Sequence, residues 1–171
     1  MVIKRIQIVV LSVSLIIITG CASIGYSFTG APITAKTISI DFFPNKARLV
    51  NPSLSQTLTD GFRDKFVNQT KMDLVEGDAD MHIEGEITDY RTNPVAIQGN
   101  EKAALNRLTI TVKVRFTNNE PDKEMDSFDQ AFTGYEDYDA SQNFSSVEDQ
   151  LVEVITERII TDVFNKAVVN W

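Results

Sequence analysis

Cys21 is the only cysteine in the chain, and it directly follows an apolar segment near the N-terminus. Lys4 and the arginine after it precede an almost continuously aliphatic run over residues 6–18, and Gly20 supplies a small side chain just before the thiol. A basic head, an apolar stretch and a small-residue cleavage site are the parts of a secretory signal peptide. A cysteine at that position resembles a lipobox, whose thiol is acylated and becomes the first mature residue. We therefore predict a lipoprotein signal peptide over residues 1–20 and lipidation of Cys21.

An uncleaved anchor helix with an incidental cysteine is the alternative. The aliphatic run has about 13 residues, which is short for a membrane-spanning helix of about 20 residues. The signal peptide is therefore the favoured interpretation. Residues 21–35 are rich in small and turn-forming residues, so we expect a lipidated tether there, followed by a single domain over 36–171.

His82 is the single histidine, and Glu84 follows it on the polar face of a predicted strand. A histidine beside a carboxylate has the chemistry for a hydrolytic dyad or a metal site. The sequence holds no Gly-x-Ser-x-Gly, His-Glu-x-x-His or phosphate-binding loop that would support either use. We therefore interpret His82 as a solvated surface residue.

Acidic residues cluster at Glu136-Asp137-Tyr138-Asp139. Carboxylate oxygens are the ligands that calcium prefers. The segment lacks the spaced Asp/Asn-Gly pattern of a calcium loop, so a solvated turn is the favoured interpretation. Four nearby aromatic residues have two possible uses, an interaction patch or ordinary core and rim packing, and packing is favoured for most of them: Phe132, Tyr135, Tyr138 and Phe144.

A basic stripe runs along one face of the clearest predicted strand, formed by Arg107, Lys113 and Arg115. Together with threonines at 109 and 111, these side chains would present hydrogen-bond donors to the phosphates of an anionic lipid headgroup. Cross-strand ion pairs with Glu84 and Glu86, which occupy the same kind of polar face one strand earlier, are the alternative explanation.

The charge balance limits the classes of partner. The chain has 24 acidic and 16 basic residues and a formal net charge of −8, and removal of the signal peptide takes away basic residues only. Nucleic acid is therefore an unsuitable partner, because its phosphates are neutralised by clustered lysine and arginine. With its single thiol acylated, the mature protein has no disulfide and no cysteine-based metal site. An apolar core must hold it together.

Periodicity predicts the elements that position these residues. Alternation over 36–43 places Ile38, Ile40 and Phe42 on one strand face, and strands are also expected near 81–88, 107–116 and 128–138. Two helices are predicted from apolar residues at four-residue spacing. The order strand, helix, three strands, helix predicts an α+β fold with two helices on one face of a four-stranded, antiparallel-rich sheet.

Capping residues set the expected helix starts. Asn51 caps the first helix with Pro52 at its first position. Ser145 and Glu148 form a capping box at the start of the second. Gly61 within the first helix costs about 1 kcal/mol relative to alanine, which indicates a tight contact at that turn.

With these elements in place, the chain resembles a known family, the LptE lipopolysaccharide-assembly lipoproteins, in particular the branch found in Bacteroidetes-type bacteria. The resemblance covers nearly the whole mature chain in the same order. It rests on the lipobox together with six segments: KTISIDFFPN (36–45), VNPSLSQTL (50–58), EGEITDY (84–90), ALNRLTITVKVRF (104–116), SSVEDQL (145–151) and FNKAVVNW (164–171).

The resemblance implies an outer-membrane lipoprotein without enzymatic activity or cofactor. Members of the family sit as a plug within the large LptD β-barrel, help it to assemble and assist lipopolysaccharide transport to the outer leaflet. For this chain it implies an LptD-type barrel and lipopolysaccharide as partners, and a periplasm-facing acyl anchor at Cys21. Arg107, Lys113 and Arg115 become candidate lipopolysaccharide-binding residues, although no family motif covers them. The rival interpretations are a small envelope lipoprotein hydrolase that uses His82, and a module that binds peptides or cell-wall fragments.

Overall fold

The computed structural model describes residues 34–49, 51–95, 104–121 and 126–169. The predicted signal peptide and Cys21 lie outside the described residues. As predicted, the fold is α+β with two α-helices. In chain order the elements are β1 (Thr37–Ile40), α2 (Leu54–Gln69), β2 (Asp73–Leu74), β3 (Met81–Val95), β4 (Leu105–Asn118), β5 (Phe128–Asp139), α3 (Phe144–Phe164) and a terminal π-helical turn, η3 (Asn165–Val169).

The sheet has five strands in the order β2-β1-β3-β4-β5, so the four-stranded prediction is wrong by one strand. Strands β3, β4 and β5 are antiparallel, whereas β1 pairs in parallel with both β2 and β3. The extra strand consists of Asp73 and Leu74, which are both exposed. Two exposed residues carry no alternating pattern, so the sequence gives no sign of this strand.

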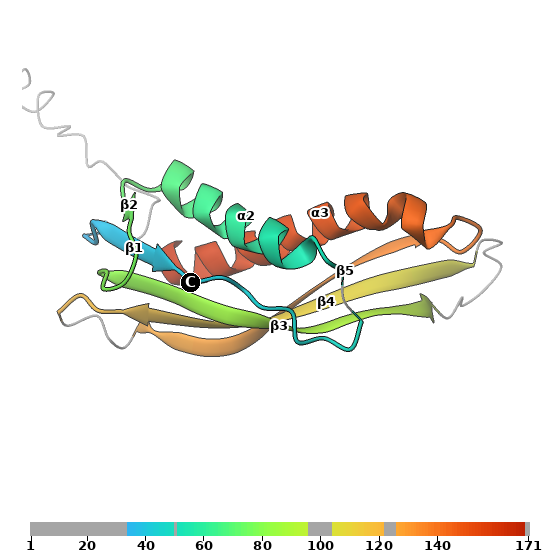
Figure 1. The fold of residues 1–171 in the computed structure, drawn as a ribbon, viewed down its shortest axis with the longest axis horizontal. Coiled ribbons are helices and arrows are strands. Elements are labelled where there is room, and N and C mark those ends of the chain that lie inside the picture. The colour runs from blue at the N-terminus through green and yellow to red at the C-terminus, as the bar shows by residue number, and fades with distance from the viewer. Residues whose placement is uncertain (1–33, 50, 96–103, 122–125, 170–171) are drawn as a thin grey trace, which may run out of the picture.

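Helices α2 and α3 lie over the same face of the sheet, as Figure 1 shows. The apolar stripes predicted for both helices are confirmed, because their members are buried: Leu54, Leu58, Phe62 and Phe66 on α2, and Leu151, Ile155, Ile159 and Val163 on α3. Val154 of α3 lies off this stripe and is 37% exposed. The core therefore lies between the helix pair and one face of the sheet.

The first strand ends earlier than its alternation predicts. Ile38 and Ile40 are buried, as expected, but Phe42 is 53% exposed and Phe43 is fully buried in its place. Strand β1 stops at Ile40, and the chain then leaves the extended period of two, so the inward-facing position moves by one residue.

Phe43 joins the sheet to α2. Its ring stacks on Phe62 with the ring centroids 4.9 Å apart. Beneath it, β3 carries Gly85, where a Cβ atom would lie 2.5 Å from Cε1 of Phe43 and would also collide with the backbone oxygen of Lys113. Glycine is therefore required at this position because the Phe43 ring and the backbone of Lys113 lie too close for a side chain, and not because of its backbone conformation.

The predicted capping box of α3 is wrong. Asn143 caps the helix instead, because its side chain accepts a hydrogen bond from the amide of Ser145 at 3.1 Å. Glu148 points into the fold, where its Oε1 accepts hydrogen bonds from the hydroxyl of Tyr90 at 2.6 Å and from Nδ2 of Asn51 at 2.8 Å. This polar junction links α3, β3 and the segment before α2.

Helix α2 begins at Leu54 rather than at Pro52, and its N-cap is Ser53, which makes no side-chain capping bond. Asn51, the predicted cap, lies two residues earlier and supplies the side-chain oxygen instead. Its Oδ1 accepts hydrogen bonds from the amides of Ser53 at 3.0 Å and Leu54 at 3.1 Å. The tight contact predicted at Gly61 is also confirmed, since a Cβ atom there would lie 2.5 Å from Cδ1 of Ile160.

Two glycine substitutions test the packing between the layers. Gly85→Ala should lower the free energy of unfolding by about 1–3 kcal/mol, because the added methyl group meets both a backbone oxygen and a buried ring. Gly61→Ala should change it by less than about 1 kcal/mol, because only the movable end of Ile160 is in the way and alanine favours the helix by about 1 kcal/mol. Urea unfolding of both variants measures the difference, and equal stabilities would contradict this account.

The junction at Glu148 predicts a dependence on alkaline pH. Burial and the nearby carboxylate of Glu148 raise the pKa of Tyr90 above its ordinary value. The unfolded chain therefore loses this proton first as the pH rises above about 10, and the native state loses stability from that pH upward. Tyr90→Phe should lower stability near neutral pH by about 1–3 kcal/mol, through the lost hydrogen bond to Glu148, and should flatten the decline above pH 10.

Urea unfolding at neutral and alkaline pH measures both effects of Tyr90→Phe. Tyr135→Phe is the matched control, because that tyrosine is 47% exposed. An equal alkaline decline in wild type and Tyr90→Phe would show that the Tyr90 phenol does not control this pH range.

Candidate functional site

The face of the sheet that points away from α2 and α3, hereafter the open face, carries the polar side chains that the sequence singles out. On β4 the predicted alternation is confirmed. The five inward residues are fully buried: Leu108, Ile110, Val112, Val114 and Phe116. The basic stripe of Arg107, Lys113 and Arg115 consequently lies on the open face. Among the described residues no helix covers this face (Figure 1).

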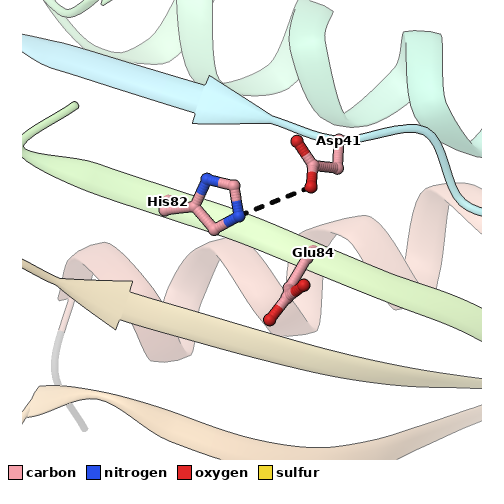
Figure 2. A group of neighbouring side chains, drawn as sticks. All are labelled: Asp41, His82 and Glu84. Atoms are coloured by element: carbon pink, nitrogen blue, oxygen red, sulfur yellow. Dashed lines mark ion pairs between the residues drawn. The ribbon is translucent and has the colours of Figure 1, made fainter. Parts of the chain in front are cut away.

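His82 lies on the open face in a cluster with two carboxylates, shown in Figure 2. Its Nε2 is 3.5 Å from Oδ2 of Asp41, and ligand atoms of Asp41, His82 and Glu84 all lie within 4.8 Å of one another. Its Nδ1 is 3.0 Å from the hydroxyl oxygen of Ser39, which is buried. His82 is therefore a surface residue, as expected, but its imidazole is only 28% exposed and has neighbours at both nitrogens.

The partners of His82 come from β1 and the residue that follows it. Parallel pairing sets Ser39 opposite His82, and the amide of Asp41 donates a hydrogen bond to the backbone oxygen of Ile83 at 2.9 Å. Alternation places Ser39 on the polar side of its strand, but the sequence does not show which strand is its neighbour. Ser39 and Asp41 are therefore the site residues that the sequence analysis missed.

Serine, histidine and aspartate are the residue types of a hydrolytic triad, yet this arrangement does not suit nucleophilic catalysis. Ser39 is only 3% exposed, whereas a nucleophilic hydroxyl must reach a substrate carbonyl. The Nδ1 end of the imidazole faces the buried Ser39, whereas the Nε2 end faces Asp41, whose side chain is 55% exposed. The two ends therefore differ in their access to solvent. The accessible part of the cluster is its pair of carboxylates with the Nε2 edge of the ring.

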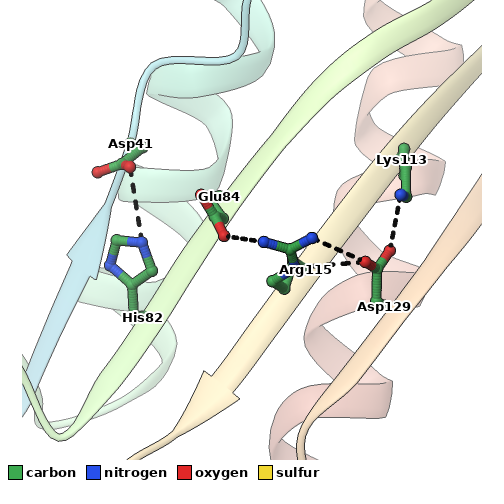
Figure 3. A network of polar contacts seen from close by, with 6 residues as sticks. All are labelled: Asp41, His82, Glu84, Lys113, Arg115 and Asp129. Carbon is green, nitrogen blue, oxygen red and sulfur yellow. Dashed lines mark hydrogen bonds and ion pairs between the residues drawn. The ribbon is translucent and has the colours of Figure 1, made fainter.

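A ladder of alternating charges continues across the sheet from Glu84, as Figure 3 shows. Register places Glu84, Arg115 and Asp129 side by side on β3, β4 and β5. Nη1 of Arg115 donates to Glu84 at 2.9 Å, and its Nη2 donates to Asp129 at 3.1 Å. Lys113 lies 3.4 Å from the other oxygen of Asp129. Hydrogen bonds from Arg115 and Lys113 lower the pKa of Asp129 below its ordinary value.

The ladder borders a hollow with a volume of about 260 Å³. Its lining consists of Glu84, Gly85, Glu86, Lys113, Arg115 and Asp129. The predicted ion pair between Glu84 and Arg115 is present, whereas Lys113 pairs with Asp129 rather than with Glu86, its register partner on β3.

Arg107 is separate from the other two cations of the basic stripe. It lies six residues from Lys113 along β4, about 20 Å at the usual strand rise. Its guanidinium donates to both oxygens of Asp137 at 2.7 and 2.9 Å, which lowers the pKa of that carboxyl group. The guanidinium also lies over the ring of Tyr135, 3.9 Å from the ring centroid. The structure thus brings Lys113 and Arg115 together and leaves Arg107 at the other end of the strand.

The acidic segment 136–139 is part of β5, so the expectation of a solvated turn is wrong. Successive side chains of a strand point to opposite faces, which separates these carboxylates. Glu136 pairs with Arg158 and Asp137 with Arg107, while Asp139 accepts hydrogen bonds from Ser141. This arrangement does not favour calcium.

The aromatic residues mostly contribute to packing, as expected. Phe132 and Tyr138 are buried, and Phe144 lies beside Tyr138 with the ring centroids 5.7 Å apart. Tyr135 is the exception, because it is exposed on the open face beneath Arg107.

Comparison with known proteins decides the family. The model of one family, described as LptE: Lipopolysaccharide-assembly, matches residues 35–167. The chain belongs to the LptE family. This confirms the predicted resemblance and gives the chain a role in lipopolysaccharide assembly. No individual curated protein matches its sequence.

Solved structures share the fold of this LptE-family chain at very low sequence identity. A minor lipoprotein from Acinetobacter baumannii is 11% identical, with a TM-score of 0.51 over 78% of this chain and 93% of the other. A hypothetical protein from Chlamydia trachomatis is 9% identical, with a TM-score of 0.53 over 79% of this chain and 98% of the other. Within the described residues, no helix is long and apolar enough to cross a membrane.

Proposed function

We propose that this LptE-family chain is a non-enzymatic outer-membrane lipoprotein that plugs an LptD-type β-barrel, helps it to assemble and assists lipopolysaccharide transport to the outer leaflet. The observation that carries the proposal is the family match over residues 35–167. Acyl groups on Cys21 hold the protein to the membrane from the periplasmic side, and two or more lipid chains are sufficient for stable anchoring.

The open face supports the plug. The interior of a large outer-membrane barrel is polar, so a domain that enters it must present polar surface. The open face does so with charges that are already paired, such as Arg115 with Glu84 and Arg107 with Asp137. Such pairs reduce the desolvation free energy that is lost when this face approaches the barrel wall. Neither member of a pair is left as an isolated charge when water is displaced.

Arg107, Lys113 and Arg115 make the proposed lipopolysaccharide contacts. Each cation has a carboxylate partner, so a phosphate group binds by replacing that partner or by sharing the cation with it. Lys113 is the most loosely held of the three, because its ion pair with Asp129 is 3.4 Å long, whereas Arg107 and Arg115 have carboxylate partners at 2.7 and 2.9 Å. Guanidinium groups favour phosphate through paired N–H donors, which suits Arg107 and Arg115.

The burial of Ser39 supports a role without catalysis. A hydrolase built on His82 requires an accessible nucleophile beside the imidazole, and the hydroxyl nearest to His82 belongs to a residue that is 3% exposed. We therefore propose that the protein acts by binding its partners and not by catalysis.

Purification of the intact lipoprotein in mild detergent tests the plug. We expect a large β-barrel protein to co-purify, and mass spectrometry of the N-terminal peptide to show an acylated Cys21. Cys21→Ser should remove the acyl groups, and the protein should then be lost from the outer-membrane fraction because the acyl chains are its proposed anchor there. Absence of a barrel from the wild-type preparation would contradict the plug, and an unmodified Cys21 would contradict the anchor.

Charge removal tests the lipopolysaccharide contacts. A variant with Arg107→Gln, Lys113→Gln and Arg115→Gln should bind lipopolysaccharide at least about tenfold more weakly, because each charged hydrogen bond contributes about 1.5–3 kcal/mol. Thermal unfolding should change little, since exposed ion pairs contribute about 0–1 kcal/mol each. Binding is measured by surface plasmon resonance on immobilised lipopolysaccharide.

The matched control removes the same charge from the helices with Arg63→Gln, Lys65→Gln and Arg158→Gln. This variant should bind lipopolysaccharide like wild type. Equal losses in both variants would show that net charge alone governs binding, and no loss in either would remove the basic stripe from the proposal.

A further inference from the structure

We propose that Asp41, His82 and Glu84 form a binding site for a divalent transition-metal ion, with zinc as the best fit. Metal binding at this site requires neither lipopolysaccharide nor the acyl anchor. It uses the Nε2 atom of His82 and one oxygen from each carboxylate, all from the cluster shown in Figure 2.

The spacing of the donor atoms fits a metal ion. Zinc lies about 2.0–2.1 Å from imidazole nitrogen and 2.0–2.2 Å from carboxylate oxygen, so two tetrahedral ligands are about 3.4 Å apart. Nε2 of His82 and Oδ2 of Asp41 are 3.5 Å apart. All three donor groups lie within 4.8 Å of one another, so Glu84 reaches the same point by a small side-chain rotation.

The surroundings orient the imidazole for this task. A histidine that ligates a metal through Nε2 carries its proton on Nδ1 and donates it to a neighbouring acceptor, which fixes the ring and its tautomer. The hydroxyl oxygen of Ser39 lies 3.0 Å from Nδ1 and is held on a buried strand residue. With Nδ1 donating to Ser39, the lone pair of Nε2 points toward the two carboxylates.

The backbone holds two of the ligands at a fixed separation. His82 is paired with Ser39 in the β1–β3 ladder, and the amide of Asp41 is hydrogen-bonded to the oxygen of Ile83. Sites on strands are more exact than sites on loops, because the register sets the distances between ligands.

Arg115 competes for Glu84 and does not prevent metal binding. Nη1 of Arg115 bonds Glu84 at 2.9 Å, but its Nε and Nη2 both bond Asp129. When Glu84 turns toward a metal ion, the guanidinium keeps its other carboxylate. The competition lowers affinity without leaving a buried, unpaired charge, since the side chain of Arg115 is 55% exposed.

The donor set selects the class of ion. Calcium and magnesium prefer oxygen ligands in larger number, whereas one imidazole and two carboxylates suit zinc and similar ions. Three protein ligands leave a fourth position for water. The side chain of Asp41 is 55% exposed, so solvent reaches that position.

The test uses the full chain in detergent, purified without a histidine tag, so that His82 is the only imidazole present. Isothermal titration with zinc chloride should give one site per chain, and the single pair of imidazole signals in a nitrogen-detected NMR spectrum should move on binding. Magnesium chloride should move neither. An unchanged imidazole spectrum at saturating zinc would overturn the proposal.

Variants locate the ion. His82→Asn, Asp41→Asn and Glu84→Gln should each weaken zinc binding at least about tenfold, and Ser39→Ala should weaken it by about 10–100-fold through loss of the ring's support. Glu86→Gln is the matched control, because it removes a carboxylate from the same strand and lies outside the cluster. It should leave the affinity unchanged. Equal weakening by Glu86→Gln would show diffuse attraction by an acidic surface, which would also overturn the site.

Discussion

The one-sided cover of the sheet is the constraint on which the rest of the structure depends. Helices α2 and α3 pack over one face, so most residues of β3, β4 and β5 that point toward them are apolar, while their neighbours on the other face must tolerate water. Strand β4 meets this demand most completely, with its five inward residues fully buried and a row of arginine, lysine and threonine on the other side. The core and the candidate site are thus two consequences of the same alternation.

On the face of the sheet that the helices cover, the packing depends on close approach between the sheet and the helices. Gly85 provides space for Phe43, and Phe43 stacks on Phe62 of α2, so a missing side chain on the sheet positions an aromatic ring under the helix. Five residues further along β3, Tyr90 bonds the carboxylate of Glu148, which also bonds Asn51 before α2. These contacts join the helix pair to the sheet at two separate points on the side opposite the open face.

Short-range sequence patterns correctly predicted the features that depend on neighbouring residues in the chain. The apolar stripes of both helices and the two faces of β4 followed from spacing alone. Asn51 was identified as a side chain that bonds amides at the start of α2, although the N-cap itself is Ser53. The errors arose where distant segments decide the outcome. Glu148 lies where a capping box is possible, but it bonds Tyr90 and Asn51 instead. The pairing of β1 with β3 brings Asp41 to His82, and no residue near either one indicates that register.

Glu84 is the residue at which the two polar systems of the open face meet. On one side it belongs to the cluster with Asp41 and His82, and on the other it bonds Arg115 in the charge ladder. A carboxylate has a limited number of lone pairs, so a stronger interaction on one side weakens the other. A cation held by Asp41, His82 and Glu84 would draw Glu84 away from Arg115 and leave that guanidinium with Asp129 and with N–H donors free for a phosphate. The two proposals are therefore linked through one side chain, and the occupancy of the cluster would tune the anion affinity of the ladder beside it.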